Sequence, residues 1–165
     1  MRRAIVLAGT VLITAFAYRA LADSYAPGST TAAPAQNGSH FASSADHVRI
    51  DSVVRLAGEE DQVVVTLTVD PEYHINANPA SNKDLIPTTL TFSGPEAKRV
   101  IYPPPVRFKA KFVDEAIDVY QGTEQIVAIF PKGSLPVNTR LRGILLVQAC
   151  TDQICLPPAE IAVSE

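Results

Sequence analysis

The sequence predicts an all-β fold, a single antiparallel sandwich of immunoglobulin-like build, and three observations support this prediction. Short apolar runs recur past residue 46, several of them rich in β-branched residues, and turn signals separate them. No segment past residue 46 holds a 3.6-residue apolar period for three turns, as an amphipathic helix would. The 13 prolines outnumber the 8 glycines and are scattered along the chain, which disfavours long helices.

The expected strands follow one another at near-regular spacing. The first runs from Val48 to Leu56, where apolar residues begin to recur. Residues 63–69 (VVVTLTV) form a β-branched run that an Asp-Pro pair closes. Further strands are expected over residues 88–92, 106–112, 126–130, 139–147 and 159–163. Polar and apolar residues partly alternate from residue 139 to residue 144, as a strand with one buried face requires.

The first 22 residues have the three regions of a secretory signal peptide. Arg2 and Arg3 precede an apolar or small run over residues 4–17, and small residues lie just before Asp23. We expect cleavage after Ala22 and a periplasmic or otherwise exported protein. A membrane anchor is the alternative, but the run is short of the roughly 20 residues that a span needs.

Two further regions follow the leader. Residues 23–46 are dominated by Ser, Thr, Ala, Gly, Pro, Asn and Gln, and such a composition buries too little surface to fold. We expect a flexible low-complexity tether there, and a single domain over residues 47–165. No apolar stretch past the leader approaches spanning length, so the mature chain is expected not to span a membrane.

The charge balance disfavours nucleic acid as a partner. The formal net charge is −3, with 14 basic and 17 acidic residues. Removal of a leader that holds Arg2, Arg3 and Arg19 but no acid leaves 11 basic and 17 acidic residues, a net charge of −6. An acidic chain without a basic stripe is poorly suited to phosphate backbones.

The two cysteines of the chain, Cys150 and Cys155, lie in the most informative stretch, CTDQICLPP. In an exported chain two such thiols are expected to pair. A structural staple is one interpretation, but a closed loop of about six residues gains only about 2 kcal/mol by loop-closure entropy. Redox exchange is the second interpretation, because a short-loop bridge at a strand end opens and closes with little backbone movement.

Metal binding is the third interpretation. The two thiolates with His74 could hold Cu(I) or zinc, ions that usually take three or four ligands. Past Met1 the chain has no methionine, it has 3 histidines in all, and no further ligands cluster around the cysteines. We therefore expect no metal and no other cofactor.

The segment 150–158, preceded by the apolar run ILLVQA, resembles the redox motif of the N-terminal periplasmic domain of the thiol:disulfide interchange protein DsbD. That family has a cysteine pair with an acidic residue between and a Pro-Pro just after. A second stretch, YHINANP at residues 73–79 continuing to LIPT at 85–88, is similar to a strand and loop of many bacterial members. The resemblance covers roughly residues 47–163.

The resemblance implies an immunoglobulin-like domain that relays reducing equivalents between protein partners by thiol-disulfide exchange. Cys150 and Cys155 would be the exchanging pair, with Cys155 forming the mixed disulfide. Asp152 would lie beside the sulfurs, where a carboxylate raises a thiol pKa; a solvated turn residue is the alternative. The implied partners are thioredoxin-like periplasmic proteins and a membrane electron donor, both on separate chains, because the chain lacks the family's membrane segment and thioredoxin-like domain.

Other residues are supporting candidates. Tyr73 could hydrogen-bond a thiolate and His74 could assist proton transfer, although each is also a common type of half-buried strand residue. The family's cap loop corresponds to residues 112–120 (FVDEAIDVY), which keep Asp114 and Glu115.

The sequence departs from the family at two points. Ala116 stands where a shielding aromatic is expected, so that Phe112 or Tyr120 would have to substitute or would belong to the core. The cysteines are separated by four residues where the best-known members have five. A non-catalytic immunoglobulin-like binding module with a structural Cys150–Cys155 disulfide is therefore the alternative function.

Overall fold

A computed structural model of the chain describes residues 42–111, 114–135 and 140–165. These residues belong to one compact unit and form a nearly all-β structure with a single short 3₁₀ turn, η1 (Ser44–His47), in the described part. The strands are β1 (Val48–Leu56), β2 (Asp61–Val69), β3 (His74–Asn76), β4 (Thr89–Ser93), β5 (Arg99–Ile101), β6 (Val106–Phe108), β7 (Ile117–Tyr120), β8 (Thr123–Phe130), β9 (Arg142–Val147), β10 (Ala149–Cys150) and β11 (Ala159–Ser164).

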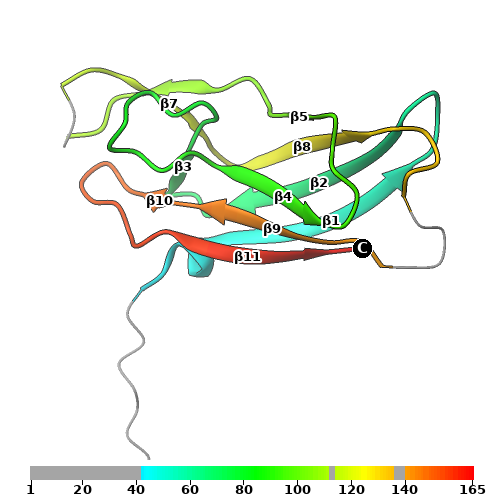
Figure 1. Cartoon of the computed structure of the whole chain (residues 1–165). Helices are drawn as coiled ribbons and strands as arrows, with labels where there is room; N and C mark the ends of the chain where they lie inside the picture. Colours follow the sequence, from blue (N-terminus) through cyan, green and yellow to red (C-terminus); the bar gives the residue numbers. More distant parts are fainter. Residues whose placement is uncertain (1–41, 112–113, 136–139) are drawn as a thin grey trace, which may run out of the picture. The chain divides into compact units, whose positions relative to one another are not determined.

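The strands form three antiparallel sheets (Figure 1). One sheet has the order β1-β2-β8-β5 and another the order β11-β9-β4. The third, β10-β3-β7-β6, lies at one end of the domain, where the chain passes from β9 into β10 and from β7 into β8. The tight connection between β7 and β8 requires Gly122, whose φ of 64° is unfavourable for residues with a side chain.

The main core lies between the long strands. Alternate residues of β2 are buried because successive side chains of a strand point to opposite faces, so that Val63, Val65, Leu67 and Val69 share one side. They join Leu145 and other apolar side chains of β8, β9 and β11 in one cluster. A second, smaller cluster lies on the face of the β10-β3-β7-β6 sheet that points away from the main core. Its buried members are Leu85, Ile117 and Val119.

The all-β antiparallel sandwich predicted from the sequence is confirmed. Each expected apolar run contains a strand, although β6 ends at Phe108, well before residue 112. The local apolar pattern predicts no strand at β3, β5, β7 or β10, because segments of two to four residues carry no readable period.

The described fold begins slightly before the expected domain boundary at residue 47. Ser44 is fully buried, and η1 packs against β1, β10 and β11, so residues 44–46 belong to the folded domain. A capping box closes this turn: the Ser43 hydroxyl accepts from the Ala45 amide and the Asp46 carboxylate accepts from the Ser43 amide. The expected signal peptide over residues 1–22 and most of the expected tether over residues 23–46 lie outside the described residues.

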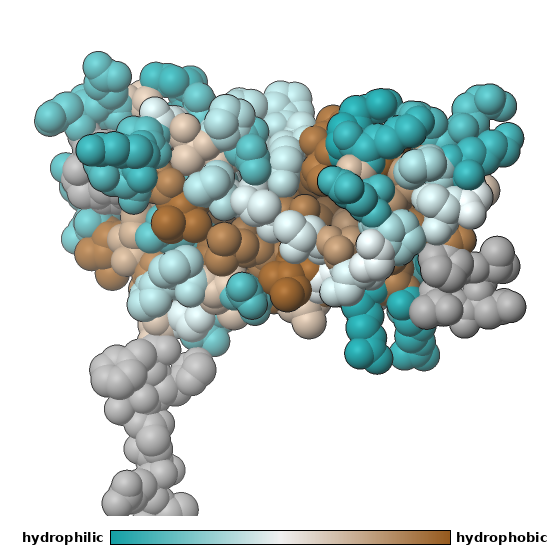
Figure 2. Space-filling view, in the orientation of Figure 1, coloured by the Kyte–Doolittle hydropathy of each residue, from teal (hydrophilic) through white to brown (hydrophobic). Residues whose placement is uncertain are grey.

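The surface is mixed in character. Figure 2 shows apolar side chains in a broken band across the middle of one face, with polar side chains above and below it. The large apolar side chains that are exposed are Val54, Leu56, Ile101, Val106, Ile144 and Ile154. In the described part of the chain no helix has the length and apolar character needed to cross a bilayer.

Candidate redox site

The disulfide predicted between Cys150 and Cys155 is present. It closes a short hairpin in which the two cysteines face each other as an isolated antiparallel bridge, with their Cα atoms 4.0 Å apart. The Leu156 amide donates to the Ala149 carbonyl at 2.9 Å, which extends the pairing beyond the disulfide. The two cysteines differ in access, because Cys150 is fully buried whereas Cys155 is half-buried.

The residues between the cysteines form a tight turn around Thr151. Its amide donates to the Ile154 carbonyl at 2.8 Å, and its hydroxyl oxygen accepts from the amides of Gln153 and Ile154, each at 3.2 Å. A threonine hydroxyl that binds backbone two or three residues on stabilises such a turn. The turn leaves Ile154 59% exposed beside Cys155, an unusual position for a large apolar side chain.

Ser44 fastens the base of this hairpin from η1. Its hydroxyl donates to the Pro157 carbonyl at 2.6 Å and accepts from the Ala149 amide at 2.9 Å. The Ser44 amide also donates to the Pro157 carbonyl, at 3.3 Å. One buried side chain therefore holds both arms of the hairpin that carries the disulfide.

Three side chains form a row across the end of the sheet. Cys150 pairs with His74 on one side and with Cys155 on the other. Residues directly opposite each other in an antiparallel ladder point to the same face, with Cβ atoms about 4.5–5.5 Å apart. His74, Cys150 and Cys155 therefore share one face of the sheet. The neighbouring Ile75 and Ala149 point to the other face and join the main core.

His74 is buried beside the disulfide. It is 1% exposed, and the ring of Phe108 lies against it, with centroids 4.3 Å apart. Its Nε2 atom is buried and has no hydrogen-bond partner. Burial lowers the pKa of His74 from 6.5 to about 4, so the ring is neutral at pH 7.

Asp152 is bound to the segment that follows β6. Its carboxylate forms an ion pair with the Lys111 ammonium at 2.7 Å, and its carbonyl accepts from the Lys111 amide at 2.7 Å. The hydrogen bond from Lys111 is the main cause that holds the pKa of Asp152 below its usual range. The negative charge that the sequence analysis placed near the sulfurs is therefore partly offset by Lys111.

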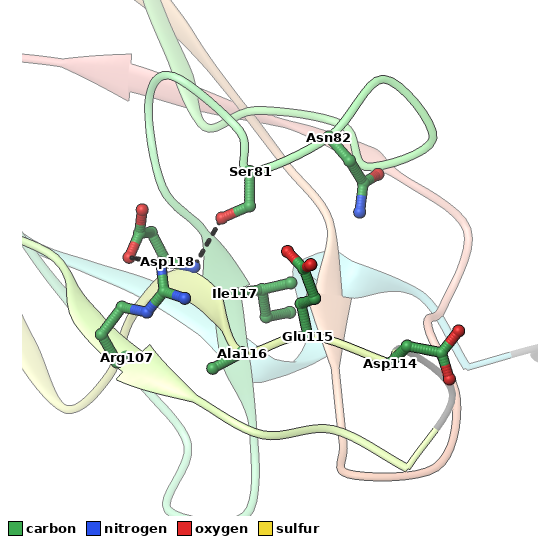
Figure 3. A pocket seen from close by; sticks show the side chains of 8 residues that line it. All are labelled: Ser81, Asn82, Arg107, Asp114, Glu115, Ala116, Ile117 and Asp118. Atoms are coloured by element: carbon green, nitrogen blue, oxygen red, sulfur yellow. Dashed lines mark hydrogen bonds and ion pairs between the residues drawn. The ribbon is translucent and has the colours of Figure 1, made fainter.

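Asp114 and Glu115 are exposed and line a hollow of about 560 Å³ (Figure 3). Figure 3 shows Glu115 directed toward the loop that carries Ser81, whose hydroxyl accepts from the Asp118 amide at 2.6 Å. The Asp114 carbonyl accepts from the Lys109 ammonium. The hollow is lined by Ser81, Asn82, Arg107, Asp114, Glu115, Ala116, Ile117 and Asp118. Asp114 and Glu115 thus lie between β6 and β7, in the connection that also contains Lys111, which binds Asp152 of the redox hairpin. They do not belong to the row formed by His74, Cys150 and Cys155.

The aromatic candidates lie in different parts of the structure. Tyr73 stacks on His47, with ring centroids 3.7 Å apart, and packs against the main core, so the structure does not group it with the cysteines. Tyr120 is also in the main core, where its hydroxyl accepts from the Asn78 amide at 2.9 Å. Phe112 lies outside the described residues. Phe108 is therefore the described aromatic that shares the disulfide face of the sheet.

Sequence reasoning missed the role of Asn76. Asparagine is a residue type that favours turns, but Asn76 is a fully buried residue of β3. Its amide nitrogen donates to the Ile86 carbonyl at 3.0 Å and to the Gln148 side chain at 3.1 Å. The Gln148 oxygen also accepts from the Ile86 amide, at 3.2 Å. This network holds the loop after β3 against the strand that carries Cys150.

A metal centre finds no support in this region. Within residues 42–111, 114–135 and 140–165, no three His, Cys, Asp or Glu side chains come together in a way that could hold a metal ion. Both cysteine sulfurs are engaged in the disulfide.

The fold and the site together define a class of protein: an immunoglobulin-like β-sandwich domain with a disulfide in a short hairpin at one end of a sheet. Residues 44–164 match the family described as "Thiol:disulfide interchange protein DsbD, N-terminal", and the chain belongs to that family. It is a family of periplasmic thiol-disulfide exchange domains. The family resemblance predicted from the cysteine motif is thus confirmed.

One solved structure shares the fold. The N-terminal periplasmic domain of ScsB from Proteus mirabilis is similar with a TM-score of 0.54 at 11% identity, over 72% of this chain and 46% of that chain. This chain therefore spans less than half of that ScsB chain. The N-terminal domain of Neisseria meningitidis DsbD in the reduced form matches with a TM-score of 0.45 at 15% identity, over 68% of this chain and 82% of that one. No curated protein matches the sequence.

Proposed function

We propose that this domain exchanges disulfides with thioredoxin-like protein partners in the periplasm through Cys150 and Cys155. The unequal burial of the two cysteines carries the proposal, because Cys150 is fully buried and Cys155 is partly accessible. Thiol-disulfide exchange requires that a thiolate reach a partner's sulfur. Cys155 therefore forms the mixed disulfide, and the buried Cys150 resolves it.

The exchange moves two electrons on sulfur and needs no cofactor. The reduced Cys155 thiolate attacks a partner disulfide, a bond forms between the two sulfurs, and the partner's other sulfur leaves with the electron pair. Cys150 then attacks Cys155, which regenerates the internal disulfide and releases the partner as a dithiol. The hairpin suits this cycle, since Ser44 holds its base while its six-residue loop carries both sulfurs.

The remaining candidate residues fit around this pair. Asp152 disfavours a nearby thiolate, and Lys111 limits that effect through the ion pair. Asp114 and Glu115 offer negative charge to a partner from the segment next to the hairpin, and Tyr73 holds the start of β3 through its stacking on His47. In this account residues 1–22 are removed on export, and the chain between them and η1 is a tether.

Stoichiometric exchange with oxidised protein disulfide isomerase, whose thioredoxin-like domains have a potential of about −180 mV, tests the proposal. The reduced wild-type protein is expected to reduce protein disulfide isomerase while it is itself oxidised, measured by thiol trapping. Cys150→Ser should accumulate a mixed disulfide through Cys155, whereas Cys155→Ser should not. The variant with both cysteines replaced by serine should keep its fold and lose all exchange.

Two outcomes would contradict the proposal. If the reduced wild type left protein disulfide isomerase oxidised, and the double serine variant bound protein partners as the wild type does, the disulfide would be the structural bridge of a binding module. Retention of stoichiometric Cu(I) or zinc by the reduced protein, without exchange, would instead identify a metal carrier.

A further inference from the structure

We propose that His74 accepts the proton of the Cys150 thiol when Cys150 resolves the mixed disulfide. This inference rests on the proposed exchange and assigns its second step to a residue outside the cysteine motif. His74 lies directly opposite Cys150 in the β3–β10 ladder, and Cys155 lies on the other side of Cys150. The base, the attacking sulfur and the attacked sulfur thus follow one another on one face of the sheet.

The unpartnered nitrogen of His74 supports this role. Buried polar atoms nearly always have a hydrogen-bond partner, because an unpaired one costs about 1–3 kcal/mol. In the disulfide form Nε2 of His74 has none. Reduction places an S–H donor on the neighbouring residue, so the partner that Nε2 lacks is created by the reaction itself. A buried ring that is neutral at pH 7 also has a lone pair ready for a proton.

The surroundings of His74 contain few competing charges. Phe108 of β6 covers the ring, and the ladder neighbour on β10 is Cys150. Arg107 of β6 and Asp118 of β7 form an ion pair at 3.3 Å and point away from the disulfide face of the sheet. In the hairpin, Asp152 forms an ion pair with Lys111.

The step balances as follows. The Cys150 S–H proton passes to Nε2 of His74, and the Cys150 sulfur attacks the Cys155 sulfur. The Cys150–Cys155 bond forms as the bond between Cys155 and the partner breaks, and the electron pair goes to the partner's sulfur. That sulfur then takes a proton from the imidazolium or from water, so the partner leaves reduced and the domain oxidised.

A thiol titration tests this assignment apart from exchange activity. In Cys155→Ser, Cys150 is the remaining thiol, and its pKa is read from the thiolate absorbance at 240 nm against pH. A neutral ring that accepts the S–H hydrogen bond stabilises the thiol, so adding His74→Gln is expected to lower this pKa by about one unit, a roughly tenfold larger thiolate fraction at pH 7. His47→Gln is the matched control, since His47 binds Asp70 and stacks on Tyr73, away from the cysteines, and should leave the pKa unchanged. An equal pKa with and without His74 would overturn the assignment.

A second measurement keeps the wild-type residue and so does not depend on a foldable variant. The ¹⁵N resonance of His74 Nε2 is expected to move when the disulfide is reduced, while the resonances of His47 stay in place. An unmoved His74 resonance would overturn the proposal. Failure of the reduced wild type to exchange with protein disulfide isomerase would instead refute the proposed function, because neither measurement here requires a partner.

Discussion

Replacing Ser44 with alanine should destabilise the domain through its redox hairpin. The Ser44 hydroxyl is fully buried and accepts from the Ala149 amide at 2.9 Å while it donates to the Pro157 carbonyl at 2.6 Å. Ser44→Ala keeps the backbone bond from residue 44 to the Pro157 carbonyl, so that acceptor stays paired. The Ala149 amide is left unsatisfied next to Cys150.

The expected loss of stability in Ser44→Ala follows from the Ala149 amide, which has lost its hydrogen-bond acceptor. An unsatisfied buried donor costs about 1–3 kcal/mol. For a domain of this size, 1 kcal/mol corresponds to about 4 °C in Tm, so a fall of about 4–12 °C is expected. The assay is thermal unfolding of the oxidised protein by circular dichroism. Ser52→Ala, at an exposed position of β1, is the control and should stay within about 0.5 kcal/mol of the wild type.

Two results would refute this reasoning. If Ser44→Ala unfolded at the same temperature as Ser52→Ala, the buried hydroxyl would carry no stability. If Ser44→Ala lost stability equally in the reduced and oxidised protein, yet left the reactivity of the disulfide toward dithiothreitol unchanged, the contact would stabilise the domain without fastening the hairpin.

Three further predictions follow from single contacts. Gly143→Ala should cost about 1–3 kcal/mol in urea unfolding, since its Cβ would lie 2.5 Å from a backbone oxygen of β4, whereas Gly58→Ala, with its nearest atom at 3.5 Å, should not; equal midpoints would contradict this. Lys111→Met should raise the pKa of Asp152, followed by its carboxyl ¹³C resonance against pH, and an unchanged titration would refute the ion pair. Because the folded pKa of His74 is about 4 against 6.5 unfolded, the wild type should lose stability as pH falls from 6.5 to 4, and His74→Gln should lose less; parallel pH profiles would contradict the burial of the ring.

The strands that the sequence predicted are those with a readable local pattern. Residues 63–69 form most of β2 because β-branched side chains pack well on a pleated surface, and their alternation matches the observed burial. The short strands β3 and β10 have three and two residues, too few for a period. They exist because tertiary pairing brings together segments that are more than 70 residues apart.

The difference between local sequence signals and tertiary contacts also explains which parts of the redox site could be predicted. The cysteine motif is local, so the disulfide could be predicted from spacing and compartment. The position of His74 beside Cys150 depends on the β3–β10 register, which no local signal reveals. Asn76 looked like a turn residue from its type, but its bonds to Ile86 and Gln148 hold it in a strand, so tertiary contacts overrode propensity.

The reduction potential of the Cys150–Cys155 pair tests the central claim most directly. Thiol trapping of the oxidised and reduced protein across a series of redox buffers would give its value. An exchanging pair should lie between about −180 and −270 mV, within the range of proteins that donate or accept disulfides. A value below about −300 mV, as structural bridges have, would contradict the account and identify the disulfide as a staple.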